Sequence, residues 1–119
     1  MQPEERDPAY LWDMLEAARH IRKYTAGLTL ERYLKEDMVR SAVERQLEIL
    51  GEAARRVSEP FKQVHPEIPW RQIIAQRNVL AHEYGEVVPT LVWKTVVTHI
   101  PSLITQLEPL IPPTPPESP

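Results

Sequence analysis

Apolar residues recur at intervals of three and four through the middle of the chain. They are Val39, Val43, Leu47, Leu50, Ala54 and Val57, flanked by Ala42, Ile49 and Ala53. This spacing places them on one face of an α-helix, which must be covered by other elements. Only three glycines occur in 119 residues, too few for the many tight turns of an all-β fold. The sequence therefore predicts an all-α protein.

Capping residues divide the first half of the chain into helices. Asp7 before Pro8 predicts the N-cap of a helix over about 8–26 that stops near Gly27. Thr29 predicts the cap of a short helix over 30–35. Asp37 predicts the cap of the helix that carries the long apolar stripe.

Prolines at positions 60, 66 and 69 interrupt the second half. They predict a connection with one helical turn around 61–64, followed by a helix from 69–70 to near Gly85. A last helix is expected over about 90–107, kinked at Pro101. Its expected buried residues are Leu91, Val92, Val96, Ile100, Leu103 and Ile104.

The predicted helices and their short connections suggest an antiparallel bundle of four to five helices. At this length the chain is expected to form one domain, over residues 1–111. Residues 112–119 are dominated by proline and offer no apolar face, so they predict a disordered or polyproline tail.

Composition and charge restrict the protein's location and partners. The chain has no cysteine, and its polar, acidic start predicts no secretory signal. No apolar run approaches a membrane span, so we expect a cytoplasmic protein without a membrane partner. The net charge of −3 argues against a protein that coats nucleic acid broadly, so any RNA contact must use a local basic patch.

One polar segment stands out as a candidate site. The four histidines lack metal-ligand spacing, and no glycine-rich phosphate loop is present. The remaining cluster is Arg77-Asn78-Val79-Leu80-Ala81-His82-Glu83-Tyr84. On an ideal helix Arg77 and His82 differ by about 140°, so a straight helix does not aim both at one atom. Either the helix loosens near His82 or a second subunit completes the site.

These residue types suit RNA cleavage by attack of a ribose 2′-hydroxyl on its own phosphate. His82 could move protons near neutral pH, and the Arg77 guanidinium could hold the phosphoryl oxygens. Asn78 could hydrogen-bond the phosphate or orient a catalytic side chain. Taken alone, the same three residues do not establish an enzyme, because such residues near a helix end are more commonly caps and surface polar groups.

The longer segment resembles the signature of HepT-like toxins in the HEPN superfamily. The similarity covers Ile68 to Tyr84, and extends to Ala42–Ala54 and to Val92-Trp93-Lys94. Within this order and spacing, an arginine, four residues and a histidine form a specific motif. The resemblance reaches from the first helix to about Leu107.

This resemblance implies a homodimeric helical bundle that cleaves cellular RNA, with transfer RNA as one candidate. Arg77 and His82 match the family's catalytic pair, and Asn78 matches the polar residue beside the arginine. The family acts without metal, and no cofactor is expected. It is typically paired with a minimal nucleotidyltransferase antitoxin, which implies a type VII-like toxin–antitoxin pair.

Tyr84 matches a tyrosine that can receive AMP from the antitoxin in HepT-like proteins. An adenylyl group there would add bulk and negative charge beside Arg77 and His82. The alternative is a packing role for Tyr84 against Leu80 and Trp93. Glu83 departs from the small or polar residues of the family, and its charge is expected to raise the pKa of His82 or to repel RNA.

Other conspicuous residues have simpler interpretations. The tryptophans at 12, 70 and 93 are expected as core or interface anchors, and the histidines at 20, 65 and 99 as surface or capping residues. Arg55, Arg56 and Lys62 form a basic cluster that could be a solvated helix end or an RNA contact. The alternative function is a non-catalytic nucleotide-binding or docking subunit of a nucleotidyltransferase complex.

Overall fold

A computed structural model describes residues 3–82 and 87–111; for residues 3–4 and 77–82 only the backbone is described. These residues form six α-helices and two 3₁₀ turns, with no strand among them. The helices are α1 (Asp7–Thr25), α2 (Leu30–Lys35), α3 (Asp37–Arg56), α4 (Glu59–Val64), α5 (Trp70–His82) and α6 (Pro89–Leu107). The predicted all-α class is confirmed, and α2 and α4 are one-turn additions to four main helices.

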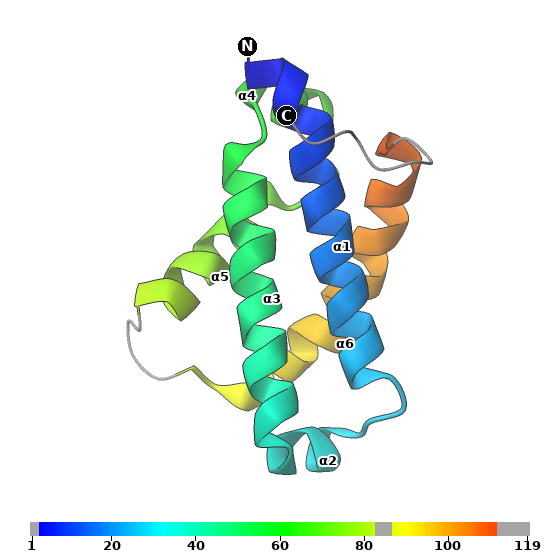
Figure 1. Cartoon of the computed structure of the whole chain (residues 1–119), viewed down its shortest axis with the longest axis vertical. Helices are drawn as coiled ribbons and strands as arrows, with labels where there is room; N and C mark the ends of the chain where they lie inside the picture. The colour runs from blue at the N-terminus through cyan, green and yellow to red at the C-terminus, as the bar shows by residue number, and fades with distance from the viewer. Residues whose placement is uncertain (1–2, 83–86, 112–119) are drawn as a thin grey trace.

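Two of the three long helices, α1 and α3, lie side by side and form the centre of the bundle (Figure 1). Helix α1 runs antiparallel to both α3 and α6, while α5 packs on the other side of α3. The predicted stripe supplies the α3 part of the core, where Val43, Leu47 and Leu50 are at most 2% exposed. Periodicity therefore identified the central packing face correctly.

The predicted end of α5 near Gly85 lies outside the described residues; the other helix ends follow the predicted positions, with two differences in how they are capped. Thr29 accepts a hydrogen bond from the Arg32 backbone nitrogen at 3.1 Å, as expected for an N-cap. Gly27 ends the first helical segment with a left-handed φ of 77°. The predictions for Asp7 and Asp37 were wrong, because both lie inside their helices, after Arg6 and Glu36 as N-caps.

The buried carboxylate of Asp7 bridges two distant parts of the chain instead. It accepts hydrogen bonds from the Ser58 backbone nitrogen at 2.9 Å and the Ser58 hydroxyl at 2.6 Å. Ser58 is itself the N-cap of α4. This contact fastens the start of α1 to the turn between α3 and α4.

Helix α6 buries the face expected for it, with one exception. Val92, Val96 and Ile100 are at most 5% exposed, but Leu91 is 63% exposed. Leu91 and Val92 are adjacent and therefore rotated by about 100°, so the core reaches only one of them in the first turn. The prediction that Leu91 is buried was wrong.

Candidate functional site

Helix α5 carries the predicted catalytic residues in its C-terminal half. Arg77, Asn78 and His82 are helical, and His82 is the last residue of α5. The structure describes the backbone of these three residues but not their side chains. Glu83 and Tyr84 lie wholly outside the described residues. The backbone thus places the three predicted residues on one helix, where a regular twist separates Arg77 and His82 by about 140°.

The N-terminal end of α5 is fixed by Trp70. Its indole nitrogen donates to the His65 carbonyl at 2.9 Å, and its ring meets Phe61 edge-to-face at 6.2 Å. Trp70 is 8% exposed, and the neighbouring Ile68 is 1% exposed. The expectation that Trp70 is a packing anchor is confirmed, and it sets where α5 begins.

Two further contacts hold this end of the helix on the bundle. The Gln106 side chain of α6 donates to the Glu67 carbonyl at 3.0 Å. Ile73 and Ile74 are half-buried and pack on the core. Because α5 is anchored at its start and lies on α3, the motif half of the helix extends away from a rigid base.

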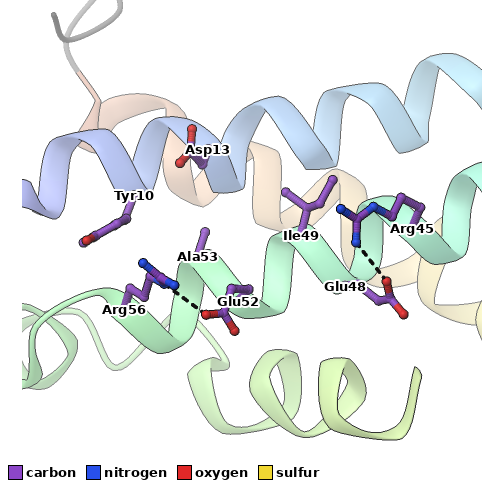
Figure 2. Close-up of a pocket in the computed structure, with 8 residues that line it drawn as sticks. All are labelled: Tyr10, Asp13, Arg45, Glu48, Ile49, Glu52, Ala53 and Arg56. Atoms are coloured by element: carbon purple, nitrogen blue, oxygen red, sulfur yellow. Dashed lines mark hydrogen bonds and ion pairs between the residues drawn. The ribbon is translucent and has the colours of Figure 1, made fainter. Parts of the chain in front are cut away.

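A groove that we call the charged groove lies between α1 and α3 (Figure 2). It is lined by Tyr10, Asp13, Arg45, Glu48, Ile49, Glu52, Ala53 and Arg56. Its cavity volume is about 370 Å³. Arg45 donates to Glu48 at 3.2 Å, and Arg56 donates to Glu52 at 3.0 Å. Most of its charges therefore already have partners within α3.

Two groups in the charged groove have shifted pKa values. Hydrogen bonding from Arg6, with a smaller contribution from Arg56, lowers the pKa of Tyr10. Desolvation of its carboxyl raises the pKa of Asp13 above the usual 3.8. Tyr10 and Asp13 both lie on α1, so these shifts belong to the α1 side of the charged groove.

A second groove, which we call the neutral groove, lies between α3, α5 and α6 and has a volume of about 340 Å³. Its apolar lining comprises Leu47, Leu50, Pro69, Ile73, Ile100 and Leu103. Its polar lining comprises Gln72, Gln76, Thr95 and His99. None of these described lining residues is Asp, Glu, Lys or Arg.

The polar residues of the neutral groove were not predicted as a site. The available sequence signal was that Gln72 and Gln76 are one helical turn apart and that Gln76 immediately precedes Arg77. The contribution of Thr95 and His99 depends on how α6 lies against α5, which residue spacing does not reveal. His99 is exposed as predicted, but it lines this groove.

The basic cluster at the end of α3 is largely engaged in local contacts. Arg55 and Arg56 both bond to Glu52, at 2.8 and 3.0 Å. Lys62 donates to the Arg55 carbonyl at 3.3 Å, and its side chain is only 11% exposed. These contacts favour the helix-end interpretation of the cluster over the RNA-contact interpretation.

The remaining aromatic anchors behave as expected. Trp12 and Trp93 are half-buried against the core, and Trp93 packs on Tyr33 with ring centroids 5.0 Å apart. Tyr33 is fully buried, and burial, reinforced by Glu44, raises its pKa to about 12. The predicted alternative contact between Tyr84 and Trp93 involves a residue outside the described ranges.

The described residues offer neither a metal-binding cluster nor a membrane-spanning helix. No three histidine or acidic side chains in these ranges lie close enough together to hold a metal ion. None of the helices seen here has the length and hydrophobicity that crossing a bilayer requires.

The fold and the site define an all-α helical bundle with a polar motif, Arg77 to His82, in the second half of α5. The family model described as "Ribonuclease HepT-like" matches residues 14–110. The chain therefore belongs to the HepT-like family, within the HEPN superfamily that the motif predicted. Arg77, Asn78 and His82 all fall within the matched range.

Several similar proteins span nearly the same length. "Probable ribonuclease HepT" of Thermococcus cleftensis is 42% identical over 85% of this chain and 92% of its own. "Putative RNase MJ1380" of Methanocaldococcus jannaschii is 34% identical over 84% of this chain and 92% of its own. A "Putative RNase" of Caldanaerobacter subterraneus is 30% identical over 86% and 91%. No solved structure matches the chain.

Proposed function

We propose that this protein is a ribonuclease whose catalytic residues are Arg77, Asn78 and His82. The observation that carries the proposal is the match to ribonuclease HepT-like proteins over 14–110, which includes the motif on α5. The relatives named above carry ribonuclease names, and the matches to the Thermococcus cleftensis and Methanocaldococcus jannaschii proteins each cover 92% of the relative. The proposed substrate is cellular RNA, with transfer RNA as one candidate.

The proposed reaction needs no metal. His82 accepts the proton of a ribose 2′-hydroxyl, whose oxygen attacks the adjacent phosphorus. Arg77 stabilises the charge that develops on the phosphoryl oxygens, and Asn78 hydrogen-bonds the phosphate. The bond to the 5′-oxygen breaks, that oxygen takes up a proton, and a 2′,3′-cyclic phosphate remains.

We further propose that two copies of the chain form the active site. A rotation of about 140° between Arg77 and His82 favours a site completed by a second protomer. Exposed apolar side chains at Leu34, Met38 and Leu91 support association, since α2 packs against both α3 and α6. Leu91→Glu should convert a dimer to a monomer in analytical ultracentrifugation.

The regulatory part of the proposal is a toxin–antitoxin pair in the cytoplasm. A minimal nucleotidyltransferase would transfer AMP from ATP to the Tyr84 hydroxyl, with pyrophosphate as the leaving group. The added phosphate would compete with RNA for Arg77, which is seven residues earlier in the sequence. RNA cleavage would then stop while the modification is present.

The deciding experiment compares the purified wild-type protein with His82→Ala on cellular RNA. We expect His82→Ala to lower the cleavage rate by about 10²–10⁴-fold, the usual contribution of a general acid–base residue. His20→Ala is the matched control, because His20 lies on the distant helix α1. Equal absence of cleavage by folded wild-type and variant proteins would instead favour the docking-subunit alternative.

Modification is tested by intact mass. Incubation with the nucleotidyltransferase and ATP should add one or more AMP units to the wild-type chain and none to Tyr84→Phe. Tyr24→Phe serves as the control at a half-buried tyrosine of α1. An unchanged mass, or a gain that persists in Tyr84→Phe, refutes the modification site without affecting the nuclease proposal.

A further inference from the structure

The neutral groove between α3, α5 and α6 has the properties of a ligand site. We propose that it holds one unstacked base of the RNA substrate. The inference rests on the proposed ribonuclease function and adds a base-binding subsite to it. Its observable consequence is a preference for the nucleotide at one position beside the cleaved bond.

The groove's walls suit the faces of a base. Ile73 of α5 and Leu103 of α6 line the groove together with Leu47 and Leu50 of α3. The two α3 leucines are each 2% exposed, so the floor that they form is continuous with the core. A flat, apolar ring system is the part of RNA that gains from such surroundings once it is unstacked.

The groove's rim suits the edge of a base. Among the described residues, neither the Gln72 amide nor the His99 ring has a hydrogen-bond partner. Gln76 donates to the Thr95 hydroxyl at 3.5 Å, a long bond that a ligand could replace. Amide, hydroxyl and imidazole groups can match the donors and acceptors of a base.

The position of the groove relates it to the proposed chemistry. Arg77 directly follows Gln76 of the groove lining on a continuous helix, so its backbone lies beside the groove. A phosphate held by Arg77 would therefore be next to a base entering the groove. Phosphate itself does not suit the groove, because no described lining residue is lysine or arginine.

The test combines a protein change with an RNA change. The protein variant is Gln76→Leu with Thr95→Val, which removes hydrogen-bonding groups while keeping side-chain volume similar. The RNA probe is an oligonucleotide that the wild-type protein cleaves at one bond. In two versions of it, the nucleotide on one side or the other of that bond lacks its base. Gln63→Leu is the control, since Gln63 is exposed on α4.

We expect the variant to cleave intact RNA about tenfold more slowly, and the wild type to lose a similar factor on one of the two abasic RNAs. Combining the variant with that abasic RNA should cause no additional loss, because both changes remove one interaction. Gln63→Leu should match the wild type on every RNA. Circular dichroism and urea unfolding verify that each variant is folded.

Other outcomes overturn the inference in distinguishable ways. Fully additive losses, or equal cleavage of intact and abasic RNA, would refute the base subsite while leaving the ribonuclease proposal standing. A variant that changes only dimer dissociation would assign the groove to a second copy. If Arg77 and His82 prove unnecessary for cleavage, the ribonuclease proposal fails, and nucleoside binding then tests the groove by itself. NMR chemical-shift changes at the Ile73 and Leu103 methyl groups on adding a nucleoside would support the base site. The absence of such changes would refute it.

Discussion

The two grooves on either side of α3 are similar in size and opposite in chemistry. The charged groove measures about 370 Å³ and the neutral groove about 340 Å³. The first contains arginines and glutamates already paired along α3, whereas the second contains amide, hydroxyl and imidazole groups over an apolar floor. Volume alone therefore does not separate a binding site from a surface depression.

The difference lies in whether the polar groups still have bonds to offer. Arg45 and Arg56 bond to glutamates of their own helix, so a ligand would have to compete with those bonds. In the neutral groove the Gln72 amide and the His99 ring have no partner among the described residues. The neutral groove also adjoins Arg77, which makes it the side of α3 that we connect with function.

The largest expected difference between the two grooves is in RNA cleavage. Arg77→Ala should lower the cleavage rate by about 10²–10³-fold, because it removes a donor to the developing charge on the phosphate. Arg45→Ala, at the charged groove, should stay within about twofold of the wild type. Initial rates of purified, folded proteins provide the measurement, and comparable losses for both variants would contradict this assignment.

The grooves should also differ in how much their floors stabilise the fold. Leu47→Ala should lower the free energy of unfolding by about 3 kcal/mol, since Leu47 is 2% exposed beneath the neutral groove. Ile49→Ala, in the half-buried lining of the charged groove, should cost about 1 kcal/mol. Urea unfolding measures both, and a larger loss for Ile49→Ala would reverse the comparison.

The paired charges of α3 should contribute only modestly. Glu52→Gln removes a partner of both Arg55 and Arg56 and should lower the free energy of unfolding by less than about 1 kcal/mol. The loss should shrink at high salt, because salt screens exposed charges. Glu31→Gln, which disrupts an exposed pair with Lys35, is the control. A salt-independent loss of several kcal/mol would show that the network is structural.

The smallest expected effect concerns Asp13. Desolvation raises its folded-state pKa above the usual 3.8, so the folded state retains its proton to higher pH than the unfolded state. Stability should therefore fall as pH rises from that usual value through the raised pKa. Asp13→Asn should lack this decrease and be slightly more stable at neutral pH. Thermal melts between acidic and neutral pH measure it, and parallel pH profiles would contradict the prediction.

Local sequence patterns predicted the helices better than the contacts between their ends. The α3 stripe and the Thr29 cap depend on spacing within one element, and both were confirmed. Asp7 also has the local pattern of a cap, but its carboxylate bonds to Ser58, 51 residues away. A distant partner of this kind leaves no trace in residue spacing.

The motif and the neutral groove show the same limit at the site. The motif from Arg77 to His82 lies within one segment, so the sequence alone was enough to recognise it. The catalytic role of these residues stays a prediction. The groove exists because α3, α5 and α6 meet there, with Gln76 of α5 within 3.5 Å of Thr95 of α6, 19 residues later. The angle between two helices depends on packing of the whole core, so the sequence pattern did not predict it.

Helix α2 illustrates how one aromatic contact can control local opening. Six residues are too few to remain helical alone, so α2 persists because buried Tyr33 rests on Trp93. When that contact breaks, all of α2 should unfold together and uncover the first turns of α6. In hydrogen exchange its amides should therefore exchange as one unit, at a lower free energy than those of α1 and α3. This end of the bundle would then be its least protected helical part.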